Sequence, residues 1–298
     1  MSIKPLNVIL TTLVLAIVFI CPLQAVSGQQ YKLGVLAKRG KEKAVNQWKP
    51  FTEYLGKATG LPFQLVPLSF KEIEPAIKDK KVDYILANSA IYVDQEQKFG
   101  IKVLASLLNL RMGKALNQFS GVIFVKKDSP IKKIGDIKGK TFMCVKKSSF
   151  GGGQMAFRHL IENGINPFKE TVLMEGRKHD NVVMAVQAGM VDVGTVRSDT
   201  FERMEAEGKI KMSDFRIIDQ AKDDFPFVHS TVLYPEWPLA FLAHVPADVN
   251  TKVKKALLGL KQDNGAAKQA KIAGWTEPLD YAPVAKCLII CILNGLQQ

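Results

Sequence analysis

Residues 146–154 are the part of the chain whose residue types and spacing could bind a ligand most directly. They read Lys-Lys-Ser-Ser-Phe-Gly-Gly-Gly-Gln. Residues 141–145, just before them, have the apolar character of a buried strand, and residues 155–163, just after them, repeat apolar side chains at helical spacing. A strand, a turn and a helix in this order direct free backbone N–H groups at one point, where the helix dipole adds partial positive charge. The pattern therefore predicts an anion-binding turn.

Two serines and two glycines of this turn are candidate ligand contacts. The hydroxyls of Ser148 and Ser149 can both donate and accept hydrogen bonds, and Gly151 and Gly152 let a ligand approach the backbone closely. The turn is not a P-loop, because no Gly-Lys-Ser/Thr follows the glycines, and it lacks the glycine spacing of a dinucleotide-binding motif. An ordinary helix start with flexible glycines would give the same local sequence, so the rest of the chain must decide between these interpretations.

Residues 1–27 have the features of a secretory signal peptide. A single charge, Lys4, precedes the apolar run 8–20, and Ala-Val-Ser at 25–27 forms a small-x-small cleavage site. The run is short for a membrane span, which leaves an uncleaved anchor as the alternative. The bulky residue before Cys21 argues against lipidation. We therefore expect export through a cleaved signal peptide and a periplasmic location.

Composition and charge exclude several classes of function. The formal net charge is +13, and it is +12 without Lys4, which favours an anionic ligand or an anionic surface. The basic residues are scattered, without an aromatic-interleaved stripe, so we expect no nucleic-acid partner. Cys144, Cys287 and Cys291 remain after the leader, and neither they nor the four histidines have metal-site spacing. No catalytic set is recognisable, so we expect no enzyme activity, metal or cofactor.

The first half of the mature chain alternates between strand and helix patterns. Residues 31–37, 63–68 and 82–87 are predicted strands, with amphipathic helices between them, which indicates a parallel α/β sheet. Ligands of such sheets lie beyond the carboxyl ends of the strands. Ser89 and Tyr92, which follow the third strand, are therefore site candidates, although a helix cap and an amphipathic tyrosine would give the same pattern.

A second α/β unit is predicted over residues 125–222. His179 and Asp180 lie at a helix start, where they could contact a ligand or be solvated cap residues. Arg197 follows the buried strand 191–196, and its guanidinium is suited to bidentate contact with an oxyanion. A surface salt bridge to a nearby carboxylate is the alternative role for Arg197.

These features together resemble the periplasmic substrate-binding proteins of the phosphate, phosphite and phosphonate ABC-transporter family. The resemblance covers residues 31–284, and its best-matching pieces are residues 148–153, 178–181, 191–195 and 274–275. Residues 196–204 and 229–238 resemble most a branch in which the binding module is also the extracytoplasmic part of sensor histidine kinases. This chain contains no kinase sequence.

The resemblance implies the type 2 periplasmic-binding-protein fold, in which two α/β lobes close over an oxyanion. Each lobe would have a mainly parallel sheet flanked by helices. One lobe would comprise residues 28–120 plus 228–298 and the other residues 121–227, with hinge strands near 119–124 and 225–231.

The family's ligand-binding elements map onto residues already singled out in this chain. The serines and glycines of the turn would hold phosphoryl oxygens, with Ser89 and Tyr92 contributing from the first lobe and His179 and Asp180 from the second. The implied function is capture of phosphate, phosphite or a phosphonate by a monomer that delivers it to an ABC permease. The alternatives are a sensing module that works with a membrane histidine kinase and a transferase- or synthase-like enzyme on the same fold.

Overall fold

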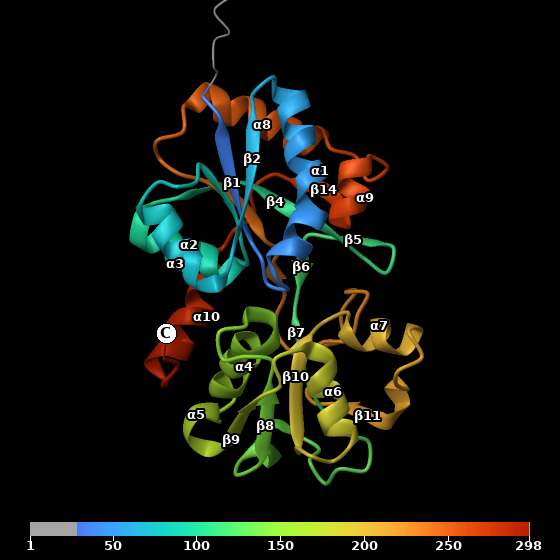
Figure 1. Cartoon of the computed structure of the whole chain (residues 1–298). Helices are drawn as coiled ribbons and strands as arrows, with labels where there is room; N and C mark the ends of the chain where they lie inside the picture. The colour runs from blue at the N-terminus through green and yellow to red at the C-terminus, as the bar shows by residue number, and fades with distance from the viewer. Residues whose placement is uncertain (1–28, 298) are drawn as a thin grey trace, which may run out of the picture.

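The computed structural model describes residues 29–297, so the predicted signal peptide lies outside the described residues (Figure 1). Two sheets, each flanked by helices, form two lobes. We call the lobe with the larger sheet lobe 1 and the lobe with the five-stranded sheet lobe 2. The prediction of a two-lobed α/β fold is confirmed.

The sheet of lobe 1 has the order β14-β4-β13-β3-β1-β2, with β5 paired to β4. Its strands are β1 (Tyr31–Leu36), β2 (Phe63–Leu68), β3 (Tyr84–Leu86), β4 (Lys102–Arg111), β5 (Lys114–Leu116), β13 (Pro238–Phe241) and β14 (Ile272–Thr276). Strands β1, β2 and β3 are parallel, and β13 runs antiparallel to both β3 and β4. Strand β4 is therefore parallel to β1, and the two strands end at the same edge of the sheet. The helices of this lobe are α1 (Lys41–Thr59), α2 (Phe70–Lys78), α3 (Ser89–Phe99), α8 (Ala247–Gly259) and α9 (Gly265–Ala270).

The sheet of lobe 2 has the order β11-β7-β10-β8-β9. Its strands are β7 (Gly121–Lys126), β8 (Thr141–Cys144), β9 (Val172–Glu175), β10 (Val193–Arg197) and β11 (Phe215–Ile217). Strands β8, β9 and β10 are parallel, so their carboxyl ends also share one edge. The helices and helical turns are η1 (Ile134–Ile137), η2 (Phe150–Gln154), α4 (Met155–Glu162), α5 (Pro167–Glu170), α6 (His179–Gln187), α7 (Thr200–Ala206) and η3 (Met212–Asp214).

Side-chain caps and one missed strand distinguish the structure from the sequence prediction. Asn88, and not Ser89, caps α3, since its side chain accepts a hydrogen bond from the backbone of Ile91. Helix α6 begins at His179, so Asp180 lies in its first turn and does not cap it. Helix α9 ends at Ala270, because Lys271 adopts a left-handed conformation and the next residues pair with β4 as β14, a strand that the sequence analysis did not predict.

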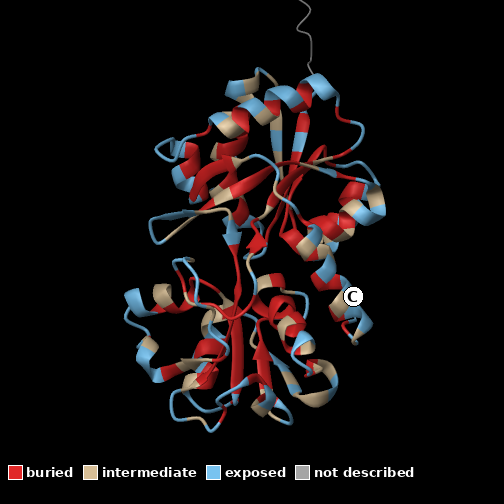
Figure 2. Ribbon diagram, turned by 180° about the vertical axis from the view of Figure 1, so that it is seen from behind, coloured by how far each residue is buried: buried red, intermediate tan, exposed pale blue. Residues whose placement is uncertain are grey.

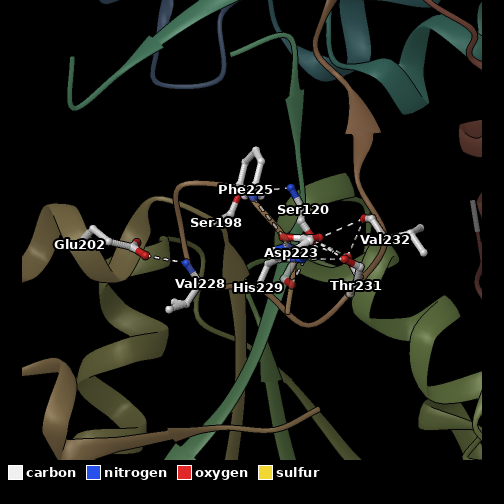
Figure 3. Close-up of polar contacts among 10 residues, drawn as sticks. Ser120, Ser198, Glu202, Asp223, Phe225, Val228, His229, Thr231 and Val232 are labelled. Carbon is white, nitrogen blue, oxygen red and sulfur yellow. Dashed lines mark hydrogen bonds and ion pairs between the residues drawn. The ribbon is translucent and has the colours of Figure 1, made fainter. Parts of the chain in front are cut away.

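The chain crosses between the lobes through a short antiparallel pair, β6 (Gln118–Phe119) and β12 (Tyr234–Pro235). Next to it, the Ser120 hydroxyl donates to the Thr231 carbonyl at 2.6 Å, and the Thr231 hydroxyl accepts from the Gly121 N–H at 3.0 Å (Figure 3). Ser120 and Ser198 also exchange backbone and hydroxyl hydrogen bonds. All of these polar groups are buried. Their mutual hydrogen bonds offset the cost of removing them from water.

The C-terminal helix α10 (Ala282–Leu293) lies between the lobes (Figures 1 and 2). It packs against α3 of lobe 1 and α4 of lobe 2. Its buried side chains belong to one apolar cluster that also contains residues of both lobes. The sequence had placed this helix in lobe 1 alone, whereas the structure joins it to both. Among the described residues, no helix is long and apolar enough to cross a membrane.

Candidate functional site

The carboxyl-terminal edges of the two sheets meet where the lobes meet. Lys38 follows β1, and Arg111 ends β4 at the same edge of the lobe 1 sheet. Arg197 ends β10, and the predicted anion-binding turn follows β8 at the facing edge of lobe 2. Because side chains that follow parallel strands collect at one edge, the fold itself gathers these polar groups. We call this region the inter-lobe junction.

Arg197 is the central residue of the junction. Its Nη2 lies 2.5 Å from the Oε1 of Glu236 in lobe 1, and its Nε donates to the Asp199 carboxylate at 3.2 Å. Its guanidinium also lies over the Phe119 ring, 4.1 Å from the centroid. Glu236 is fully buried, and the Arg197 side chain is nearly so. Burial acts to raise the pKa of Glu236, but the positive charge and hydrogen bond of Arg197 outweigh it and lower the pKa. The predicted surface salt bridge of Arg197 is therefore in part a buried contact between lobes.

The junction contains more positive than negative charge. Lys38, Arg39, Arg111 and Arg197, which we call the cationic cluster, surround only two carboxylates, those of Asp199 and Glu236. Arg111 Nε lies 3.6 Å from Asp199 Oδ2, and this buried nitrogen has no hydrogen-bond partner. Burial and the like charge of Arg197 lower the pKa of Arg111. A cluster in which four cationic groups surround two carboxylates is an electrostatic site for an anion.

Lys38 is held in the cluster by an aromatic contact. Its Nζ lies 4.4 Å from the centre of the Trp237 ring, a cation–π distance. Solvent reaches part of the side chain. Surrounding protein, followed by the charges of Arg111, Arg197 and Arg39, nevertheless lowers the pKa of Lys38 to about 7. The ammonium ion therefore lacks enough nearby negative charge, and an added anion would stabilise it.

His179 is a neutral hydrogen-bond donor at the junction. Its Nδ1 accepts a hydrogen bond from the backbone N–H of Arg197 at 3.2 Å, so the ring proton resides on Nε2. Burial, followed by the charges of Arg197 and Lys38, lowers the pKa of His179 to about 3. The ring therefore stays uncharged at neutral pH and presents one N–H without adding charge.

The serine–glycine turn lies next to Arg197. Gly151 is so close to Arg197 that a Cβ at Gly151 would lie 3.5 Å from the arginine Cβ. Ser148 is exposed and Ser149 is half-buried, and η2 begins directly after them. The Lys147 N–H already donates to the Glu175 carboxylate at 2.7 Å and the Ser149 N–H to the Lys146 carbonyl at 3.0 Å. The first N–H groups of η2 have no acceptor within the helical segment, so these could meet an anion. Lys146 reaches across to Phe70 of lobe 1, with Nζ 6.0 Å from the ring centre.

The glycines of the turn are required by packing against the protein itself. A Cβ at Gly151 would lie 2.8 Å from the Phe119 ring, and one at Gly152 would lie 2.6 Å from Val145. Distances this short require atoms to move. The glycines thus fit the turn against the hinge and β8, and close approach by a ligand remains a prediction.

Three of the predicted site residues have structural partners away from the cationic cluster. The Ser89 hydroxyl donates to the Pro235 carbonyl at 2.7 Å and is fully buried. Tyr92 packs edge-on against Tyr281, with 5.0 Å between ring centres, and lines a surface hollow of ≈ 360 Å³. Asp180 forms an ion pair with Arg203 at the surface of lobe 2. The structure therefore brings together the turn, His179 and Arg197, but not these three.

Arg111 and Glu236 are among the junction residues that the sequence analysis did not single out. Both lie at the ends of strands of the lobe 1 sheet, Arg111 at the last residue of β4 and Glu236 just before β13. A usable signal was a charged residue at the boundary of an apolar strand. Their partners, however, lie far away in the sequence: Arg111 and Asp199 are 88 residues apart, Glu236 and Arg197 are 39 apart, and Glu236 and Asn109 are 127 apart. Only the assembled sheets show which charges meet.

A family model described as the periplasmic substrate-binding protein of phosphonate ABC transporters matches residues 33–281. The tetrathionate sensor histidine kinase of Salmonella typhimurium is 29% identical over 230 residues, which are 76% of this chain. The match covers 39% of that kinase, so the chain spans about two fifths of the length of this curated relative. Helix α10 lies beyond the part matched by the family model.

Solved structures share the fold at low sequence identity. A Xanthomonas citri protein bound to ATP has a TM-score of 0.69 at 20% identity, covering 89% of this chain and 96% of its own. A binding-protein component of a Pseudomonas aeruginosa phosphonate transporter has a TM-score of 0.63 at 16% identity, with 90% and 88% covered. PhnD1 of Prochlorococcus marinus in complex with methylphosphonate also scores 0.63, at 14% identity, with 87% and 96% covered.

Proposed function

This chain belongs to the periplasmic substrate-binding proteins of phosphonate ABC transporters, and we propose that it captures a small oxyanion at the inter-lobe junction. Proteins of this family serve transport, deliver their ligands to an ABC permease and are not enzymes. The sequence prediction of a non-enzymatic binding protein is therefore confirmed at the level of the family. The identity of the anion and the residues that hold it are the substance of the proposal.

The observation that carries the proposal is the meeting of two kinds of anion-binding group at the junction. The cationic cluster has four cationic groups and two carboxylates. Beside it, the Ser149 hydroxyl, the N–H groups of the turn and the His179 Nε2–H are neutral donors. Charged groups attract an oxyanion, and directed neutral donors orient its oxygens. Phosphate, phosphite and phosphonates have both the charge and the several acceptor oxygens that this arrangement requires.

Closure of the lobes would couple binding to a change of shape. The ligand would contact Arg197 and the turn from lobe 2, and the positive charges of lobe 1 would attract it across the junction. A ligand that contacts both lobes binds the closed arrangement better than an open one and shifts the population towards it. The hinge residues Ser120 and Thr231 already hold the crossing segments together through buried hydrogen bonds. We propose the lobes to be residues 28–120 plus 228–298 and residues 121–227.

The first experiment is a thermal-shift panel on residues 28–298 with phosphate, phosphite, methylphosphonate, 2-aminoethylphosphonate, sulfate and tetrathionate. A ligand at a hundred times its Kd stabilises a protein by about 2.7 kcal/mol, which gives a clear shift. We expect a shift with at least one of these oxyanions, and Ser149→Ala should weaken its binding about tenfold through loss of a hydrogen bond. Ser213→Ala, an exposed serine in η3 of the same lobe, is the matched control. Absence of any shift from a folded sample would contradict the proposal, and an unchanged affinity in Ser149→Ala would exclude this serine from the site.

A second candidate role is ligand sensing for a membrane histidine kinase. The observation that favours it is the 29% identity to the tetrathionate sensor kinase. A transport role predicts ligand-dependent association with a permease, whereas a sensing role predicts it with a kinase. Crosslinking of the loaded protein in the membranes of its native cell, followed by identification of the attached protein, decides between them.

We also propose that residues 1–27 are removed during export to the periplasm. The apolar run and the small residues at its end support this proposal. Sequencing the N-terminus of the protein recovered from the cell envelope tests it, and a start at Gly28 is the expected result. Retention of residue 1 would contradict it.

A further inference from the structure

The cationic cluster is divided between the two lobes. Arg197 belongs to lobe 2, where it adjoins His179 and the turn, whereas Lys38, Arg39 and Arg111 project from the edge of the lobe 1 sheet. Glu236 takes one Nη of Arg197 and also accepts a hydrogen bond from Asn109 at 2.8 Å. Asp199 takes the Nε of Arg197. The two carboxylates are therefore engaged chiefly by Arg197, and the lobe 1 cations are left with little compensation.

Two independent observations show that the lobe 1 cations have weak negative partners. Arg111 forms an ion pair with Asp199, but at 3.6 Å it is longer than a hydrogen bond. The Nε of Arg111 is buried and donates no hydrogen bond, an arrangement that normally costs free energy. Among residues 29–297, Lys38 forms no ion pair, and its Nζ faces the Trp237 ring. The lowered pKa values of Lys38 and Arg111 agree with both observations. The Nε of Arg111 is therefore a buried cationic donor that a ligand could satisfy, and Lys38, whose side chain is exposed, adds positive charge beside it.

We propose that Lys38 and Arg111 form a second anion subsite, so that the junction takes a ligand with an anionic group at each of two ends. One oxyanion group would meet the turn, His179 and Arg197, and the other would meet Lys38 and Arg111. This inference rests on the proposed function and narrows its ligand class from a single oxyanion group to a double-ended dianion. Bisphosphonates, phosphonocarboxylates and polythionates have this chemistry, and tetrathionate has a sulfonate group at each end.

Charge distribution explains why one anionic group would not suffice. A single phosphonate bound to Arg197 and the turn leaves the lobe 1 cations with the same unpaired donors as before. A second group joined by a short linker reaches them without a second loss of translational freedom, so its contacts add directly to affinity. It would also neutralise the repulsion among Lys38, Arg39 and Arg111.

Isothermal titration calorimetry with paired probes tests the proposal. The one-ended probes are methylphosphonate and methanesulfonate, and the two-ended probes are methylenebisphosphonate, phosphonoacetate and tetrathionate. We expect at least one two-ended probe to bind ten- to a hundredfold more tightly than its one-ended counterpart, as for a gained charge-assisted contact. Arg111→Gln and, separately, Lys38→Met should abolish that preference, because each removes a contact that only the two-ended probe makes.

Lys102→Gln is the matched control, because it removes an exposed charge from the opposite end of β4. It should leave every affinity unchanged. Arg111→Gln removes a repelled charge and should therefore melt no lower than the parent, which the same samples can show. The inference is overturned if one-ended probes bind as tightly as two-ended ones, or if Arg111→Gln weakens both classes equally. If no probe binds, the proposed function itself is contradicted, and the second subsite, which depends on it, falls too.

Discussion

Arg197 at the end of β10 and Glu236 before β13 form a buried ion pair between the lobes, with 2.5 Å separating Nη2 and Oε1. A buried pair gains little net stability, because desolvation of both charges opposes their attraction. Its effect is instead geometric. Separation of the lobes would break this contact between Arg197 and Glu236, so the pair favours the arrangement in which both sheet edges face each other. Glu236 already accepts a hydrogen bond from the Arg197 guanidinium, which the proposed ligand would also contact.

Glu236→Gln should weaken the fold and strengthen anion binding. We expect the free energy of unfolding to fall by up to about 3 kcal/mol, the low end for a broken buried pair, because Asp199 still neutralises Arg197. Removal of the negative charge should increase oxyanion affinity roughly tenfold. Chemical denaturation and calorimetry measure the two effects. Asp263→Asn, an exposed acid in lobe 1, is the control and should change neither quantity. A weaker affinity in Glu236→Gln would show that the carboxylate itself orders the site.

Oxyanion affinity should fall as pH rises through about 7. Burial and the charges of Arg39, Arg111 and Arg197, partly offset by Glu236, lower the pKa of Lys38 to about 7. Below that pH the amine is protonated and attracts the anion, and above it the protein must take up a proton to bind. Titrations between pH 6 and 9 should use a probe of constant charge, such as tetrathionate or sulfate. Lys38→Met should remove the dependence. An equal decline in this variant would assign the dependence to another group.

The stability of the unliganded protein should change in the opposite sense over that range. Between about pH 7 and the ordinary pKa of a lysine near 10.5, the unfolded chain binds more protons than the folded one at Lys38. Stability therefore rises with pH there, because the penalty of a crowded charge disappears.

Acid should destabilise the protein through His179. Burial and the charges of Arg197 and Lys38 lower its pKa to about 3, from 6.5 in the unfolded chain. Between these values the unfolded chain binds more protons, so the free energy of unfolding falls as pH decreases from 6.5 to 3. His179→Asn, whose side-chain oxygen can still accept the Arg197 N–H, should flatten that slope. Urea titrations at pH 7, 5.5 and 4 measure it, and an identical slope in the variant would assign the loss to other groups.

Gly152→Ala should disturb the turn, since the new Cβ would meet Val145 at 2.6 Å and the Ser149 hydroxyl oxygen at 2.9 Å. Overpacking of this kind costs about 1–3 kcal/mol, and displacement of Ser149 should also weaken oxyanion binding. The control is Gly135→Ala in η1, where a Cβ would meet nothing within 4 Å. Thermal melts and calorimetry on both variants provide the comparison. Equal effects in the two would show that the turn accommodates a side chain.

Local sequence patterns predicted the elements of the fold better than they predicted the site. The order of strand, turn and helix around residues 141–163 is confirmed, because apolar periodicity and glycine placement are local properties. The antiparallel strands β13 and β14 were missed as such because their partner, β4, lies far away in the sequence. Arg111 was missed for the same reason, because the contacts of a charged residue at a strand end depend on residues across the junction that are distant in the sequence. Asp180 is the opposite case: local sequence suggested a ligand contact, but in the structure its carboxylate pairs with Arg203 at the surface.

Helix α10 should stabilise the contact between the lobes although it lies outside the matched family region. Leu288 is 8% exposed and packs in the apolar cluster shared by both lobes, whereas Leu293 on the same helix is 79% exposed. Leu288→Ala should lower the free energy of unfolding by about 2–4 kcal/mol, as for other buried leucines. Leu293→Ala, the matched control, should change it by no more than about 0.5 kcal/mol.

Because α10 contacts both α3 and α4, Leu288→Ala should also make the lobes open more readily, which small-angle X-ray scattering detects as a larger radius of gyration without ligand. A destabilised variant with an unchanged radius would restrict the role of α10 to packing, and equal loss in both variants would contradict the burial argument.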